Sequence, residues 1–86
     1  EAFGPQNTFS IANPAANVLK VDYSLESTGG MLDIVDLQGR RLGRWALREG
    51  KHEEQFDISA IGQGLYLLQL HGDGWKAEAK RLLILR

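Results

Sequence analysis

The residues that could carry catalysis are a small set of serines, histidines and acids. Nucleophilic catalysis needs a serine beside a base, and no serine of this chain lies in a Gly-x-Ser-x-Gly elbow. Glu53 and Glu54 could not act together on one bond, because neighbouring residues of a strand point to opposite faces. The sequence therefore predicts no enzyme activity. The other candidates for chemistry are Ser10, Ser24, Ser27 and Ser59, with His52 and His71 interpreted as surface residues of strands.

Metal and phosphate binding have less support than structural roles. Asp33, Asp36 and Asp57 could line a calcium site if their strands met, but no loop has the dense Asp and Asn spacing of a calcium loop. The chain has no cysteine, which excludes disulfides and thiolate zinc sites. The run Gly62-Gln63-Gly64 is too short to cradle a phosphate and precedes a strand. We therefore expect no metal and no cofactor.

Two tryptophans and a set of arginines are candidates for binding. Trp45 and Trp75 could stack on sugars, but the favoured interpretation is that each fills one end of a hydrophobic core. The chain also has a basic cluster of Arg40, Arg41, Arg44 and Arg48, in which Arg40, Arg44 and Arg48 have the same parity and could line one face of a regular strand. Charge balance against neighbouring acids is the favoured interpretation of this cluster.

The elements that must position these residues belong to one small domain. The chain has 86 residues, of which 43% are hydrophobic and 24% charged, as in ordinary globular domains. Its formal net charge of −1 gives no reason to expect a nucleic-acid partner. No segment has the roughly 20 apolar residues of a membrane helix.

Short apolar segments separated by turn signals every ~8–12 residues are typical of a β-sandwich or barrel. Thr28-Gly29-Gly30 and Glu49-Gly50 are expected to end strands, and a helix within Trp75–Leu85 is the less favoured alternative. The pattern predicts about seven strands, within 8–11, 19–25, 31–37, 40–47, 51–58, 65–70 and 75–85. The side chains expected to be mostly buried are Leu19, Val21, Tyr23, Ile34, Phe56, Tyr66 and Leu68.

The strongest local signal is the segment Asp36-Leu37-Gln38-Gly39. Asp at the first position and Gly at the fourth favour a type I turn followed by a bulge glycine. We expect the Asp36 carboxylate to accept backbone N–H groups of the turn, and Gly39 to adopt positive φ.

Several short motifs occur in an order that resembles a known family. They are Asn13-Pro14, Asp36-x-x-Gly39-Arg40, Asp57-Ile58-Ser59, Gly64-Leu65-Tyr66, and Lys80 before an apolar end. Together they resemble the C-terminal sorting domain of the type IX secretion system of Bacteroidota-type bacteria. The resemblance covers about residues 9–86. Two positions depart from the family pattern, because Ile11-Ala12 precede Asn13 and Val35 precedes Asp36.

This resemblance implies a seven-stranded, immunoglobulin-like antiparallel β-sandwich that serves as an export signal. It implies transit through the periplasm and an outer-membrane translocon to the outer surface or the medium. The implied partners are proteins of the secretion machinery, including a sortase-like peptidase that removes the domain and joins its passenger to lipopolysaccharide. We expect residues 1–7 to be a linker remnant and residues 8–86 to form the sorting domain.

The resemblance also suggests roles for individual residues. Lys80 is expected to be an exposed charge, Gly64 to permit close backbone approach and Tyr66 to fill core space. Two alternatives stay open: a retained anchoring or interaction module of the secretion machinery, and a sugar-binding module that uses both tryptophans. The structural motif is expected to comprise Asn13, Pro14, Asp36, Gly39, Arg40, Gly64 and Tyr66, and the recognition segment Lys80, Arg81, Leu82, Leu83, Ile84, Leu85 and Arg86.

Overall fold

A computed structural model describes residues 7–77 and 79–86 of the chain. Over these residues the protein is all-β with no helix, which confirms the all-β part of the predicted fold class. All strand pairs are antiparallel. There are six strands where about seven were expected: β1 (Thr8–Ile11), β2 (Val18–Val35), β3 (Arg41–Asp57), β4 (Gly64–Gly72), β5 (Trp75–Lys76) and β6 (Lys80–Ile84).

The first half of β2 has the predicted period of two. Leu19, Val21, Tyr23 and Leu25 are buried, while the alternate residues from Lys20 to Ser24 are exposed or half-buried. A strand directs successive side chains to opposite faces, so this half of β2 presents one apolar face to the core. Its neighbours are β1 on one side and the second half of β3 on the other.

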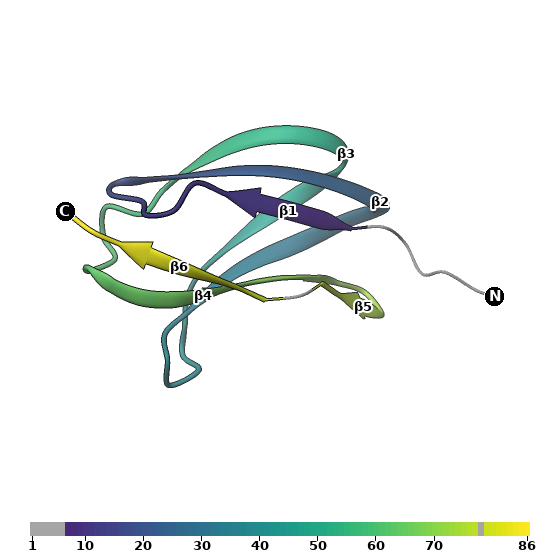
Figure 1. The fold of residues 1–86 in the computed structure, drawn as a ribbon. Coiled ribbons are helices and arrows are strands. Elements are labelled where there is room, and N and C mark those ends of the chain that lie inside the picture. Colours follow the sequence, from purple (N-terminus) through teal and green to yellow (C-terminus); the bar gives the residue numbers. More distant parts are fainter. Residues whose placement is uncertain (1–6, 78) are drawn as a thin grey trace.

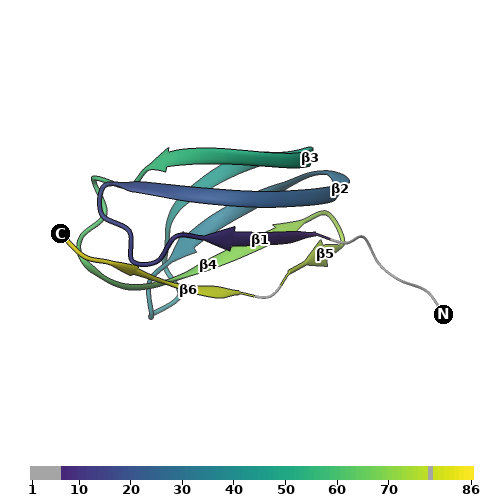
Figure 2. The ribbon, with the colours of Figure 1, turned by 45° about the horizontal axis from the view of Figure 1, so that its top comes forward.

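The six strands form one sheet that curls around the core (Figures 1 and 2). β2 pairs with β1, β3 and β4, and β4 pairs in turn with β5 and β6. Ala15, which follows β1, makes a parallel bridge to Ile84 of β6. The sheet order β1-β2-β4-β6 therefore returns to the segment after β1, and the curl closes at the end of the molecule that holds the C-terminus.

The two strand ends expected at Thr28-Gly29-Gly30 and Glu49-Gly50 are wrong, because both strands continue through these residues. β2 passes Thr28-Gly29-Gly30 with a register shift between Leu25 and Gly29. β3 passes Glu49-Gly50, where Gly50 has φ of 102°. An irregular register with glycine at positive φ bends a strand without ending it. The long hairpin of β2 and β3 thus bends over the core (Figure 1).

The last predicted strand, residues 75–85, is divided into β5 and β6. β5 pairs with the end of β4 around a turn that contains Gly74, and β6 pairs with the start of β4. The helical alternative for this segment is wrong, since 75–76 and 80–84 are strands.

The core lies inside the curl. Five of the seven side chains predicted to be mostly buried are buried, whereas Phe56 and Tyr66 are only half-buried. Phe56 stacks on Trp45 with a ring-centroid distance of 4.8 Å, so the two rings cover one side of the core. The fully buried large side chains are Leu19, Val21, Leu25, Leu32, Ile34, Ile58, Leu68, Leu70, Leu82 and Ile84.

The predicted linker remnant at residues 1–7 lies outside the described residues except for Asn7. The Asn7 side chain accepts the backbone N–H of Glu26 at 2.8 Å and donates to the hydroxyl of Ser27 at 3.1 Å. Asn7 is therefore bound to the bend of β2.

Candidate functional site

The Asp36–Gly39 segment forms the predicted turn. One Asp36 carboxylate oxygen accepts the N–H groups of Gln38 and Arg40, both at 2.9 Å, and the other accepts Arg40 Nε at 2.8 Å. Gly39 donates to the Asp36 carbonyl at 3.0 Å and has φ of 87°. The Arg40 backbone and side-chain bonds, joined by that of Gln38, lower the pKa of Asp36. The Asp-x-x-Gly-Arg motif is thus a self-contained turn.

Gly39→Val should destabilise the domain by about 1–3 kcal/mol, because a β-branched residue is strained at positive φ. No atom lies within 4 Å of a Cβ placed at Gly39, so the cost comes from the backbone alone. Gly39→Asn is the matched control, since Asn tolerates this conformation better. Chemical denaturation measures both variants, and equal stabilities for valine and glycine would overturn this account of the turn.

The Asn-Pro motif binds the last strand across almost the whole sequence. Asn13 Nδ2 donates to the Arg81 carbonyl at 3.0 Å, and Asn13 Oδ1 accepts the Leu83 N–H at 2.9 Å. Ala15 continues this pairing, because its N–H donates to the Leu83 carbonyl and its carbonyl accepts the Leu85 N–H, both at 2.9 Å. Asn13 precedes a cis peptide bond to Pro14. We call Asn13–Ala15 the clamp, since it covers the edge of β6 that β4 leaves open.

Asn13→Ala should lower the free energy of unfolding by about 1–2 kcal/mol, because two backbone groups of β6 lose their partner at a solvent-accessible site. Asn13→Asp keeps an acceptor for Leu83 but loses the donor to Arg81, so we expect an intermediate stability. Urea denaturation is the measurement, and Gln55→Ala on an exposed position of β3 is the control. A loss for Asn13→Ala no larger than that of the control would contradict the clamp.

Arg86 is also held, by Asn17 before β2 and by the loop that follows β3. Arg86 Nε donates to Asn17 Oδ1 at 2.7 Å, its Nη2 donates to the Ile58 carbonyl at 2.9 Å, and its N–H donates to Gln63 Oε1 at 2.8 Å. In the Asp57-Ile58-Ser59 motif, Asp57 Oδ1 accepts the Ser59 N–H at 2.9 Å, and the bonds from Ser59 lower the pKa of Asp57. Ile58 between them is buried.

The Gly64-x-Tyr66 motif begins β4 at the same end of the molecule. The Tyr66 hydroxyl donates to the Gly62 carbonyl at 2.7 Å, and its ring is half-buried against the core. A Cβ at Gly64 would meet the Tyr66 ring at ordinary contact distances of 3.7 Å and more, so close backbone approach is not what this position requires. Gly64 instead has φ of 151°, which side-chain-bearing residues rarely adopt.

The predicted recognition segment, residues 80–86, alternates between two faces. Leu82 and Ile84 are fully buried, and Lys80 has their parity and is half-buried. The Lys80 ammonium lies 5.3 Å from the centre of the Phe9 ring, so the expectation of a freely exposed charge is wrong. The alternate residues of the segment, directed away from the core, are Arg81, Leu83 and Leu85.

Three of the four arginines in the predicted basic cluster pair with acids of the chain, which confirms charge balance for Arg40, Arg44 and Arg48. Among the residues that the structure describes, no acid pairs with the fourth, Arg41. Arg40 pairs with Asp36, and Arg48 Nη2 lies 3.7 Å from Glu54 Oε2. Arg44 makes a bidentate pair with Asp33, with distances of 2.7 and 3.0 Å.

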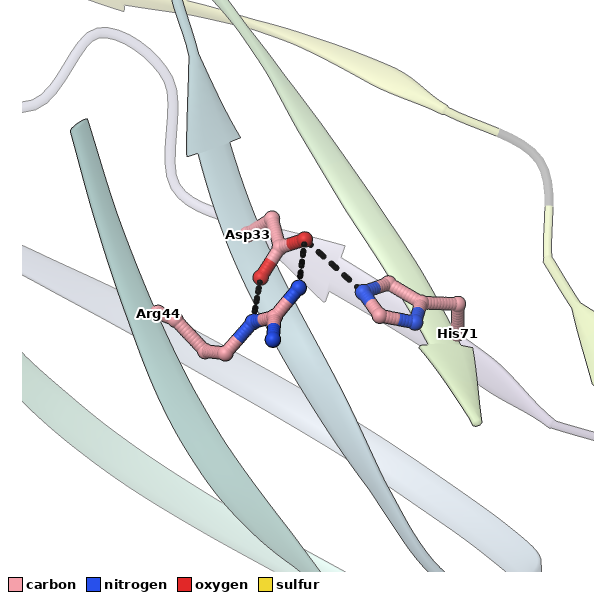
Figure 3. A network of polar contacts seen from close by, with 3 residues as sticks. All are labelled: Asp33, Arg44 and His71. Carbon is pink, nitrogen blue, oxygen red and sulfur yellow. Dashed lines mark hydrogen bonds and ion pairs between the residues drawn. The ribbon is translucent and has the colours of Figure 1, made fainter. Parts of the chain in front are cut away.

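Asp33 is the one buried charged residue among those that the structure describes. Besides Arg44 it contacts Nε2 of His71, at 2.8 Å (Figure 3). The three side chains come from β2, β3 and β4, and Asp33 lies between the other two. The Arg44 guanidinium, helped by His71, lowers the pKa of Asp33 against the opposing effect of burial. The sequence analysis did not predict this network. The available signal was the position of Asp33 between the apolar residues Leu32 and Ile34, where an acid needs a partner if it is buried.

Acid should destabilise the protein through its carboxylates. The pKa values of Asp33, Asp36 and Asp57 are below 3.8 in the folded state, so their contribution to stability is present above that value and is lost as pH falls through the folded pKa. We expect the melting temperature to drop between about pH 5 and pH 2. Melting curves at stepped pH values would measure it. Asp33→Asn should show a shallower drop, and an equally steep drop would contradict the role of Asp33.

The Trp75 ring packs directly against the backbone of Gly30 and Gly72. A Cβ at Gly72 would lie 2.5 Å from Trp75 Nε1, and one at Gly30 would lie 3.0 Å from the same ring. Trp45 is stacked on Phe56. Both rings are half-buried and pack against the core, as the favoured interpretation expects, and these contacts lend no support to sugar binding.

Within residues 7–77 and 79–86, no three metal-ligating side chains come together. The same part of the chain contains no helix long and apolar enough to cross a membrane. The only histidine–carboxylate contact in this part of the chain joins His71 and Asp33, and no serine hydrogen-bonds to either side chain. The contacts of Asp33, Arg44 and His71 link three strands of the sheet.

The structure is a small all-β domain in which the clamp, after the first strand, is hydrogen-bonded to the last strand. The sequence profile of the family described as "Secretion system C-terminal sorting domain" matches residues 12–85. The chain therefore belongs to this family, the C-terminal sorting domains of type IX secretion, as the resemblance implied. A sorting domain of this kind marks an exported protein. No curated protein and no solved structure gave a significant match.

Proposed function

We propose that this domain directs a larger protein through the type IX translocon of the outer membrane to the bacterial surface. The observation that carries the proposal is the family match over residues 12–85. The geometry supports it, because Asn13 at the start of the family match holds the last strand in place. The domain has no enzyme role in this proposal.

The curled sheet is, in this proposal, a version of the immunoglobulin-like sandwich that the resemblance implies. Its support is the bend of the β2–β3 hairpin over the core, which sets β1 and the first half of β2 against β4 and β6 (Figure 2). Two facing layers with a shared apolar interior are the essential feature of a sandwich.

Residues 80–86 are proposed to take part in recognition by the secretion machinery. The residues of this segment alternate between two roles. The inward residues pack in the core and hold the strand in place, and the outward residues Arg81, Leu83 and Leu85 are available to contact a partner protein. The domain passes through the periplasm and reaches the outer surface with its passenger. Removal by a sortase-like peptidase would then separate the two.

The test is transfer of export. Residues 8–86 are fused after a periplasmic reporter in a bacterium that has type IX secretion, and the reporter is measured at the surface, in the medium and in the periplasm. We expect surface or released reporter with the domain and periplasmic reporter without it. Reporter held in the periplasm in both cases would overturn the proposal.

The alternative of a retained interaction module makes a different prediction about mass. A cargo that is processed loses the domain, so its mature mass excludes these residues, whereas a component of the machinery keeps them. Intact mass measurement of the full-length protein isolated from the cell surface decides between the two.

A further inference from the structure

One row of side chains on the outer face of the sheet has an arginine at each end and two apolar residues between them. The strand register pairs Arg41 with Val35, Val35 with Leu67, and Leu67 with Arg81. Directly paired residues share a face of a sheet. Since strands lie ~4.8 Å apart, the two arginines at the ends of this four-strand row are roughly 14 Å apart at the backbone.

Arg41 and Arg81 differ from three of the other arginines because no described residue forms an ion pair with either guanidinium. Arg40, Arg44 and Arg48 pair with acids of the chain, and Arg86 donates to Asn17 and to the Ile58 carbonyl. Among residues 7–77 and 79–86, no carboxylate pairs with the guanidinium of Arg41 or Arg81. Both side chains are exposed.

Between and beside the arginines the same face is apolar. Leu65 is 42% exposed and Leu85 50% exposed, although large apolar side chains of a small domain are more often buried. Leu83 pairs directly with Leu65, which joins β6 to β4 on this face. We call this surface the leucine face, comprising Val35, Leu65, Leu67, Leu83 and Leu85 with Arg41 and Arg81 at its margins.

The shape and charge of the leucine face favour a protein over a lipid. Val35 is only 7% exposed, and Leu67 and Leu83 are half-buried, so most of these side chains lie within the sheet surface and do not project as a membrane wedge would. An apolar centre with two unpaired cations at its margins is complementary to an apolar surface with carboxylates at its margins.

We propose that the leucine face docks onto an acidic, apolar protein surface in which two carboxylate groups flank an apolar patch and pair with Arg41 and Arg81. The assignment of the docking partner to the secretion machinery rests on the proposed function. The docking surface therefore combines the outward residues of segment 80–86 with residues of β2, β3 and β4. Lys80, Leu82 and Ile84, which face inward, make no contact with the partner.

The test uses the full-length protein in its secreting host, with a photo-crosslinking amino acid at Leu83. We expect a protein adduct whose linked peptide, read by mass spectrometry, carries Asp or Glu beside apolar residues. Arg41→Glu with Arg81→Glu should reduce the adduct and the exported protein by about tenfold, which corresponds to ~1.4 kcal/mol of binding. The matched control is Lys20→Glu with Lys51→Glu, two exposed lysines on the outer face of the other half of the sheet.

The outcomes separate the docking surface from the proposed function. The double arginine variant should melt within about 2 °C of the native protein, because both side chains are exposed and neither forms an ion pair with a residue that the structure describes. Export unchanged in a folded Arg41→Glu, Arg81→Glu protein overturns the docking surface while the sorting function stands. A lipid adduct, a second copy of the chain or a linked peptide without acids also overturns it. Export that persists without residues 8–86 instead overturns the proposed function itself.

Discussion

Removing residues 80–86 should abolish both the folded domain and the export of the protein that carries it. The deletion removes β6, whose Leu82 and Ile84 side chains are fully buried. It also removes the backbone groups of residues 81–85 to which the clamp is hydrogen-bonded. Losing each of these two core side chains alone costs about 2–5 kcal/mol, which is comparable to the whole stability of a domain of this size. We therefore expect no cooperative melting transition, and full-length protein that accumulates in the periplasm.

A milder variant is needed because loss of export after this deletion could follow from unfolding alone. Lys80→Ala removes a half-buried side chain and its contact with the Phe9 ring, at a cost of about 0.5–1 kcal/mol. Since Lys80 faces inward, export should persist as long as the domain stays folded. A loss of export with a normal melting curve would show that Lys80 itself is recognised. Normal export after the deletion would refute the sorting function.

Asp33→Ala should be the most destabilising single polar substitution, by roughly 3 kcal/mol. It removes the partner of a bidentate Arg44 pair and of His71, and breaking a buried pair leaves an uncompensated charge in place. The Asp33 side chain is 8% exposed but Arg44 is 39% exposed, so water can rehydrate the arginine and limit the loss. Thermal and urea denaturation at pH 7 measure the effect.

The control for this variant replaces the network by apolar residues of similar size. Asp33→Leu with Arg44→Met and His71→Leu removes all the charges together, and such exchanges are often neutral or stabilising. We expect this triple variant to regain most of the stability lost in Asp33→Ala. If the triple variant is less stable than Asp33→Ala, the loss comes from packing and not from the unpaired Arg44.

The sequence predicted features whose signals are local. Alternation in Leu19–Leu25 identified a strand with one buried face, and the spacing of Asp36 and Gly39 identified a turn with positive φ, because neighbouring residues decide both features. The parity of Lys80 with Leu82 and Ile84 also indicates an inward direction, whereas the usual exposure of lysine predicts the opposite. The structure follows the parity, because Lys80 is half-buried beside the Phe9 ring.

Other features depend on residues that are distant in the chain. Gly29-Gly30 and Gly50 resemble strand ends in sequence, but the partner strand continues beside them, so the hydrogen bonding persists through a bend. Asn13 and Leu83 are separated by 70 positions, and no local pattern indicates that one side chain binds the other's backbone. The burial of Asp33 likewise requires Arg44 and His71 from two other strands.

The clamp makes completion of the domain a condition for folding. Asn13 is synthesised near the start of the domain, whereas its partners at positions 81 and 83 are among the last residues of the domain to be made. A chain whose translation stops early lacks these partners and the two buried side chains of β6, so it leaves the edge of β4 unpaired and the core open. The finished fold is thus one that only a chain translated through the end of β6 can form. Under the proposed function, a secretion system that recognises this fold would not export chains that stop within the domain.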